Sequence, residues 1–153
     1  MTGILLLDTG VLGVVANPKA SGSSRACKEW LDAVLIQGCS VFVPEIADYE
    51  VRRELIRANK VKGIERLDEL GEAIGYLPLS TEMMRRAAEL WAESRQRGQP
   101  TASPSSLDAD VILAAQAIIA GEKLGEPVLV ATNNVRHLSV CHRHNVPRQM
   151  SRR

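Results

Sequence analysis

The 153-residue chain is poor in cysteine, in aromatic residues and in net charge. Its three cysteines are odd in number and far apart, and no secretory segment precedes the first apolar run, so a disulfide scaffold is not expected. No apolar run approaches the ~20 residues that a membrane-spanning helix needs. With only two Trp, two Tyr and one Phe, the core must be mostly aliphatic. These absences predict a soluble, reduced, cytoplasmic protein.

A formal net charge of +1 says little about partners, but the charges are unevenly distributed. After Glu126 there is no acidic residue, whereas five arginines and all three histidines lie in that last segment. Such a basic end could meet phosphate groups, and the alternative is a solvated, frayed tail. The length suits one domain, which we expect over residues 1–147, followed by a basic and flexible tail over residues 148–153.

Short apolar runs alternate along the chain with stretches of helical spacing. Strands separated by helices indicate an α/β protein with a parallel sheet and right-handed crossovers. Glycines at positions 38 and 98 are expected to end the helices that precede them, and a turn-rich loop over residues 99–106 precedes the most apolar helix. The predicted strands are 3–7, 40–43, 76–79 and 127–131, and the predicted helices are 25–37, 45–58, 64–74, 81–97 and 111–120.

The first apolar run ends abruptly on Asp8-Thr9-Gly10, so a carboxylate stands at the carboxyl end of a strand that should be buried. In open α/β sheets this edge commonly carries the functional site. Because an unpaired buried carboxylate is costly, Asp8 needs a cation, hydrogen-bond donors or water. The alternative is that Asp8 only caps the next segment, residues 11–16.

The second strand runs straight into a helix that carries three glutamates. At about 100° per residue, Glu50 and Glu54 lie within about 40° of each other on a common face, and Glu50 is nearer the carboxyl edge of the sheet. Glu54 has an ordinary explanation, an ion pair with Arg53 or Arg57. Glu45 is expected to complement the positive end of the helix dipole.

Asp108 and Asp110 stand where the turn-rich loop meets the apolar helix. Asp108 suits the N-cap, with Ser106 as a competitor, and Asp110 then falls in the first turn. The positive helix end would keep both carboxylates ionised, which favours metal binding over general-acid chemistry. Carboxylates gathered at one edge repel one another, and hard cations such as Mg²⁺ or Mn²⁺ are the usual remedy.

Four segments, in this order and at this spacing, resemble the PIN-domain nucleases, and most closely the VapC-type toxins of toxin–antitoxin pairs. The family places an Asp after strand one, a Glu on the helix after strand two, an Asp at the start of the late apolar helix, and an Asp or Asn after strand four. The matching residues here are Asp8, Glu50, Asp110 and Asn134. The segments are LLLDTG at 5–10, VPEIADYEVRREL at 43–55, LDADVILAA at 107–115, and VATNN at 130–134 with RHL at 136–138.

The resemblance implies a three-layer fold with a central parallel sheet of four to five strands flanked by helices. It also implies a metal-dependent endoribonuclease, the toxin of a type II toxin–antitoxin system. Asp8, Glu50 and Asp110 would hold one or two Mg²⁺ or Mn²⁺ ions, with Asp108 as a further carboxylate ligand. The ions would activate a water for hydrolysis of an RNA phosphodiester.

Around the metal, the resemblance implies that Thr9, Thr132 and Asn134 position the ligands or the phosphate. Arg136 and His137 are candidates for contacting the RNA backbone, and the alternative for Arg136 is an ordinary surface position. The implied partners are an RNA substrate, a cognate antitoxin and a second copy of the chain in a homodimer.

Two departures from the family pattern leave a second function open. Gly10 stands where members often carry Ser or Asn, and Asn134 offers a neutral oxygen in place of a carboxylate. The alternative is therefore a catalytically degenerate domain that binds RNA or a protein.

Other readings of the same motifs fit less well. Leu7-Asp8-Thr9-Gly10 also occurs in retroviral-type aspartic proteases, but their fold is almost all strand, whereas helical periodicity covers most of residues 24–120. A phosphoacceptor domain would also display acids at a sheet edge, yet the Asp-x-Asp and Thr-Asn-Asn segments are less natural there. A zinc site is disfavoured because no standard ligand spacing is met by His137, Cys141, His142 and His144.

Overall fold

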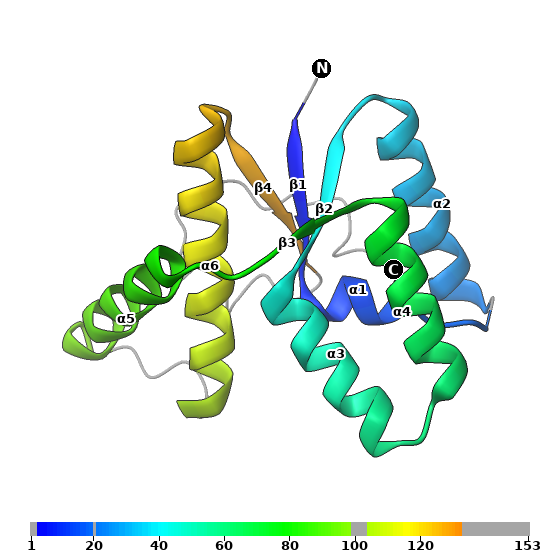
Figure 1. Ribbon diagram of the computed structural model, residues 1–153, viewed down its shortest axis with the longest axis horizontal. Helices are drawn as coiled ribbons and strands as arrows, with labels where there is room; N and C mark the ends of the chain where they lie inside the picture. Colours follow the sequence, from blue (N-terminus) through cyan, green and yellow to red (C-terminus); the bar gives the residue numbers. More distant parts are fainter. Residues whose placement is uncertain (1–2, 20, 99–103, 133–153) are drawn as a thin grey trace.

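Strand β1 (Ile4–Leu7) lies inside the sheet because its four residues are apolar on both faces, and all four are buried. The computed structural model describes residues 3–19, 21–98 and 104–132. Within these ranges the sheet has four strands, all parallel, in the order β3-β2-β1-β4 (Figure 1). The other strands are β2 (Ser40–Pro44), β3 (Gly75–Leu77) and β4 (Val128–Ala131).

One face of the sheet is covered by four helices. Leu5 and Leu7 of β1 point toward this face, together with Val41 and Val43 of β2. The helices are α1 (Thr9–Val15), α2 (Gly22–Ile36), α3 (Glu45–Arg57) and α4 (Val61–Ala73). They contribute buried side chains to the same cluster, among them Val11, Leu12, Cys27, Leu31, Val51 and Leu67.

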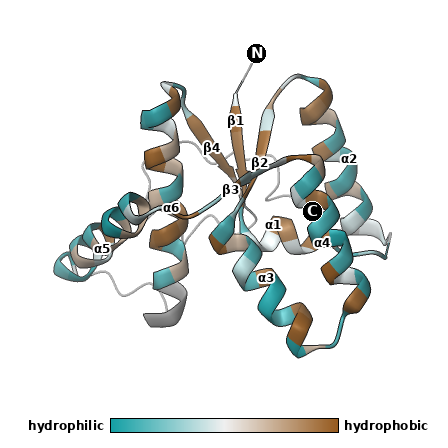
Figure 2. Ribbon diagram, viewed as in Figure 1, coloured by the Kyte–Doolittle hydropathy of each residue, from teal (hydrophilic) through white to brown (hydrophobic). Residues whose placement is uncertain are grey.

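The opposite face is covered mainly by one long helix, α6 (Pro104–Leu124), which packs Leu113 and Ala117 against Ile4 and Leu6. A further helix, α5 (Thr81–Gln96), packs on the outer side of α6. Being covered on both sides explains why α6 is apolar around most of its circumference. Figure 2 shows β1 and β4 mainly in apolar colours, while α3 and α5 carry many polar residues. The predicted layered α/β fold with a parallel sheet is confirmed.

Helices α2 and α5 end at the glycines that the sequence predicts. Gly38 and Gly98 follow the C-cap residues of α2 and α5 and adopt positive φ values of 89° and 64°, a backbone conformation that glycine reaches without a Cβ clash. Strand β3 is shorter than predicted and begins at Gly75, where a Cβ would overlap the ring of Phe42 on the neighbouring strand. Pro78 lacks the N–H that would extend the ladder.

The largest difference from the sequence prediction concerns the start of α6. This helix begins at Pro104, whereas the sequence predicts a turn-rich loop up to residue 106. Proline is favoured in the first turn of a helix, where its missing N–H leaves no bond unmade. The predicted tail at 148–153 lies outside the described residues. Within the described ranges, no helix combines the length and the apolar character that crossing a bilayer requires.

Candidate active site

Asp8 lies at the carboxyl end of β1 and is the N-cap of α1, with only 6% of its surface exposed. Its Oδ1 accepts a hydrogen bond of 2.8 Å from the N–H of Val11, and the N–H of Gly10 and the hydroxyl of Thr132 also donate to the carboxylate. The predicted capping role is therefore confirmed. The carboxylate does more than cap α1, because Thr132, which directly follows β4, also donates a hydrogen bond to it.

Thr132 meets Asp8 because their strands are neighbours. Leu7 pairs with Ala131, and the N–H of Asp8 continues the ladder with a 3.0 Å bond to the carbonyl of Ala131. Thr132 follows Ala131 directly and is buried. The predicted convergence of these two strand ends at one edge of the sheet is thus present in the structure.

Glu50 reaches the same edge from α3. The Thr9 hydroxyl donates a 2.7 Å hydrogen bond to Glu50 Oε1 across 41 residues of sequence. Arg53 Nη2 lies 3.5 Å from Glu50 Oε2, one turn along the helix. Helices α1 and α3 are in direct contact near Thr9 and Glu50. A Cβ on Gly13 of α1 would lie only 3.9 Å from Cγ2 of Val51 on α3. Asp8, Thr9, Glu50 and Thr132 together form what we call the Asp8 site.

The surroundings of Asp8 disfavour the ionised form of its carboxyl group. Burial raises the pKa of Asp8 above its ordinary value, and the negative charge of Glu50 raises it further. The hydrogen bonds from Thr132, Val11 and Gly10 act in the opposite direction without cancelling the rise. The structure therefore places the buried carboxylate of Asp8 close enough to the partly exposed carboxylate of Glu50 for the two charges to repel each other.

Cys27 of α2 is a neighbour of the site that the sequence did not single out. Burial raises the pKa of its thiol, and the charge of Asp8 adds to the rise, which places the thiol within electrostatic reach of the carboxylate. Cys27 belongs to the apolar cluster on this face of the sheet. The sequence does not indicate that Cys27 lies near Asp8, because this proximity depends on how α2 packs against the sheet.

Asp108 and Asp110 lie in α6, beyond its first turn. The predicted N-cap role of Asp108 is wrong, because the helix begins four residues earlier, and Asp108 is exposed. Asp110 is half-buried and stands between Ala109 and Val111, which pack on the sheet side and on α5 respectively. Figure 1 shows α6 running opposite to the strands, so its first turns lie toward the carboxyl edge of the sheet.

The predicted ligands are only partly brought together. Within the ranges that the structure describes, no three His, Cys, Asp or Glu side chains are grouped so that they could hold one metal ion. Asp8 and Glu50 lie within electrostatic reach of each other, whereas the participation of Asp110 and Asp108 stays a prediction. Asn134, Arg136 and His137 lie outside the described residues.

The remaining glutamates of α3 behave as predicted. Glu54 pairs with Arg57 at 2.9 Å on the helix surface. Glu45 lies in the first turn of α3. Its Oε1 also accepts a 2.9 Å hydrogen bond from the N–H of Leu79, and so fixes the connection that follows β3.

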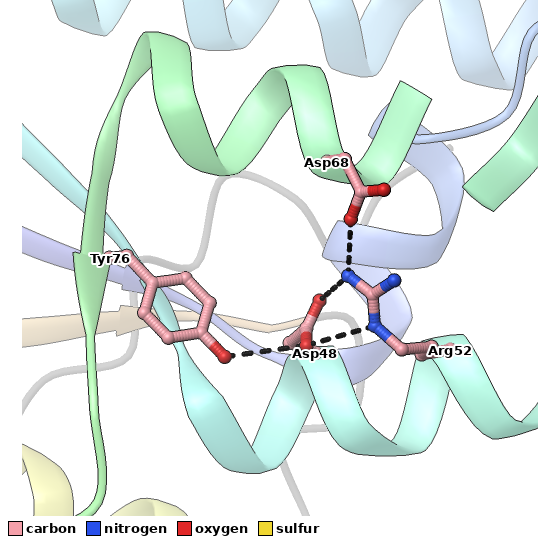
Figure 3. A network of polar contacts seen from close by, with 4 residues as sticks. All are labelled: Asp48, Arg52, Asp68 and Tyr76. Atoms are coloured by element: carbon pink, nitrogen blue, oxygen red, sulfur yellow. Dashed lines mark hydrogen bonds and ion pairs between the residues drawn. The ribbon is translucent and has the colours of Figure 1, made fainter. Parts of the chain in front are cut away.

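A second acidic group on α3 was not predicted. Arg52 donates to Asp48 Oδ1 at 3.0 Å and to Asp68 Oδ1 of α4 at 2.6 Å, and the hydroxyl of Tyr76 donates to Asp48 Oδ2 at 3.3 Å (Figure 3). We call these four residues the Arg52 cluster. The spacing of Asp48 and Arg52 could have indicated one ion pair, but not the residues that α4 and β3 add.

The chain is similar to known proteins both in sequence and in fold. The PIN domain family matches the sequence over residues 5–143. The fold is similar to a chain in the crystal structure of VapBC2 from Rickettsia felis bound to a DNA fragment from their promoter, with a TM-score of 0.66 and 19% sequence identity over 89% of this chain and 91% of that chain. No curated protein matches the sequence. Because the family match covers most of its length, this chain belongs to the PIN domain family.

Proposed function

We propose that this chain is a metal-dependent endoribonuclease that serves as the toxin of a type II toxin–antitoxin pair. The observation that carries the proposal is the buried Asp8 beside Glu50, with Thr9 bonded to Glu50, at the carboxyl edge of a parallel sheet. Membership of the PIN domain family supports a nuclease role. The similarity to a VapBC2 structure supports a toxin–antitoxin role.

The Asp8 site fits a hard divalent cation. Its donors are carboxylate oxygens, which Mg²⁺ and Mn²⁺ prefer, and the mutual repulsion of Asp8 and Glu50 would be relieved by a positive charge between them. We propose Asp110 as the third ligand and Asp108 as a further one. A bound ion supplies an activated water and offsets the charge that develops on the phosphate.

The chain itself orients these ligands before substrate arrives. Thr9 holds Glu50 through one carboxylate oxygen, while the N–H groups of Val11 and Gly10 and the Thr132 hydroxyl hold Asp8. Such supporting bonds fix the direction of each ligand and so reduce the reorganisation needed during reaction.

The proposal also assigns roles to three residues that follow β4 in the sequence. Asn134 would position a ligand or the phosphate, and Arg136 and His137 would contact the RNA backbone. All three follow Thr132 in the sequence, and Thr132 lies at the same edge of the sheet as Asp8.

The test is cleavage of mixed RNA by the purified protein in Mn²⁺ or Mg²⁺ and in chelator. Asp8→Asn and Asp110→Asn should abolish cleavage, as should chelator. Asp32→Asn, an exposed position on α2, is the matched control and should cleave like the wild type. Cleavage that persists in Asp8→Asn or in chelator would refute the proposal, because it would come from another protein or another site.

A degenerate domain that binds RNA without cutting it is the second candidate. Two observations favour it: Glu50 Oε2 already faces Arg53 at 3.5 Å, and the described residues hold no group of three metal-binding side chains. RNA that is retained by the wild-type protein but never cut, in either metal, would establish this alternative.

The proposed partners besides RNA are a cognate antitoxin and a second copy of the chain. The VapBC2 structure supports the first of these. Light scattering of the protein alone and of the protein co-expressed with its neighbouring reading frame should give the mass of a dimer and of a larger complex. The mass of a monomer in both samples would exclude both partners.

A further inference from the structure

An exposed aromatic residue stands beside the Asp8 site. Tyr49 immediately precedes Glu50 on α3, and 56% of its surface is exposed. The guanidinium of Arg53 lies over its ring, 5.3 Å from the ring centroid. The same arginine places Nη2 at 3.5 Å from Glu50 Oε2. Arg53 therefore links the aromatic ring to a candidate metal ligand through two contacts.

Packing within the chain does not explain this aromatic residue. Tyr49 belongs to none of the apolar clusters formed by the described residues, although the chain has only five aromatic side chains. The other tyrosine, Tyr76, is less exposed and donates its hydroxyl to Asp48 in the Arg52 cluster. The ring of Tyr49 is instead presented to solvent with a cation stacked on it.

An exposed ring and a planar cation are the two groups on which proteins stack unpaired nucleic-acid bases. The ring offers a π-face to any base, and arginine can stack on a base while attracting a phosphate. A base inside a duplex already has its faces covered by its neighbours, so such a platform selects single strands.

We infer that Tyr49 and Arg53 form a stacking platform for an unpaired RNA base next to the Asp8 site. The inference rests on the proposed function, because it assumes an RNA substrate. It adds two residues that position an unpaired base of that substrate. Arg53 then serves both the platform and Glu50, and so couples the placement of the base to the placement of a ligand.

The first experiment measures RNA binding without cleavage. Fluorescence anisotropy with a labelled single-stranded RNA oligonucleotide in chelator gives the affinity of the wild type, Tyr49→Ala and Tyr49→Phe. Loss of one stacking ring should weaken binding about 5- to 150-fold. Tyr49→Phe keeps the ring and should bind within about twofold of the wild type.

The chain offers a matched control for the arginine. Arg95 lies over the ring of Trp91 at 4.7 Å on α5, in the layer outside α6. Arg53→Ala and Arg95→Ala remove the same charge from the same kind of pair, so their net charges are identical. Only Arg53→Ala should weaken RNA binding.

A modified substrate separates stacking from charge. A series of oligonucleotides with one abasic position, moved along the strand, should contain one that binds the wild type as weakly as Tyr49→Ala binds the intact strand. Tyr49→Ala should lose nothing further on that oligonucleotide. A blunt duplex of the same sequence should bind more weakly than the single strand and should not respond to Tyr49→Ala.

Three results would overturn the inference. Tyr49→Ala could bind single-stranded RNA as tightly as the wild type, Arg95→Ala could weaken binding as much as Arg53→Ala, or Tyr49→Ala could change the mass in solution, which would make this face an interface between copies. Binding that depends on Tyr49 in a protein that never cuts would refute the proposed activity alone. A wild type that binds no RNA refutes both.

Discussion

Helix α3 carries two acidic groups of opposite electrostatic character, two residues apart in sequence. Asp48 belongs to the Arg52 cluster, where one guanidinium serves two aspartates and a tyrosine hydroxyl adds a further bond. Glu50 belongs to the Asp8 site, where a second carboxylate is its neighbour, and within residues 3–19, 21–98 and 104–132 the cation that pairs with it is Arg53, at 3.5 Å.

The difference between Asp48 and Glu50 shows that the partners of a carboxylate indicate whether its role is structural or functional. Charges that are compensated inside the chain hold elements together: the Arg52 cluster ties α4 and β3 to α3. Charges of one sign that are kept together and desolvated cost stability, and are typical of sites that receive a ligand. One helix thus serves the fold on one side and the candidate active site on the other.

The largest expected effect separates Glu50 from Glu54, two of the three glutamates of α3. Glu50→Gln removes a proposed ligand charge and should reduce RNA cleavage by at least about 100-fold, since even the supporting partners of metal ligands are worth roughly 10- to 100-fold. Glu54→Gln, one turn along and paired with Arg57 at the surface, should leave the rate unchanged. Initial rates on one RNA at saturating Mn²⁺ measure both. Equal rates for the two variants would show that Glu50 is an ordinary surface residue.

The next effect concerns stability and the compensated group. Arg52→Met leaves Asp48, with a side chain only 14% exposed, facing Asp68 without a cation, and should lower the free energy of unfolding by about 2 kcal/mol. Arg57→Met breaks a pair whose side chains are 73% and 60% exposed, and should cost less than about 0.5 kcal/mol. Urea denaturation compares the two midpoints. A shared midpoint would mean that the Arg52 cluster contributes no more than a surface pair.

The uncompensated group should respond in the opposite direction. Because the pKa of Asp8 is raised, its ionised form destabilises the folded state at neutral pH, so Asp8→Asn should raise the melting temperature by a few degrees in chelator. Asparagine can still accept the Val11 N–H and cap α1. Saturating Mg²⁺ should remove the difference by stabilising the wild type alone. A lower melting temperature in chelator would show that Asp8 is purely a structural cap.

Much of the Asp8 site was predictable because it depends on strand and helix periods. An apolar run that stops at Asp8 identifies the strand end, and the helical period places Glu50 toward the same edge. The capping bond from Val11 needs only three residues of sequence. Such features are set by local backbone geometry, which a single sequence encodes.

The remainder depends on how elements dock and on which side chains compete. Pro104 starts α6 within a turn-rich stretch and so moves Asp108 away from the helix end, which composition alone does not reveal. The Arg52 cluster needs α3, α4 and β3 in one arrangement. Arg53 could have paired with Glu54, but it lies over Tyr49 and faces Glu50.

The smallest effect is a titration that reports on the Arg52 cluster directly. Burial, and then the charges of Asp48 and Glu45, raise the pKa of Tyr76 from 10.0 to about 12. Between these values the folded state holds one proton more than the unfolded state, so the contribution of Tyr76 to stability is complete below pH 10 and is lost as the pH rises toward 12. Tyr49→Phe leaves Tyr76 as the single tyrosine, and ultraviolet absorbance then follows its ionisation. Adding Asp48→Asn should lower the midpoint, because it removes a negative charge that opposes the phenolate. If the midpoint does not move, Asp48 and Tyr76 are not partners in solution. The Arg52 cluster would then no longer serve as the charge-compensated group in the comparison with the Asp8 site.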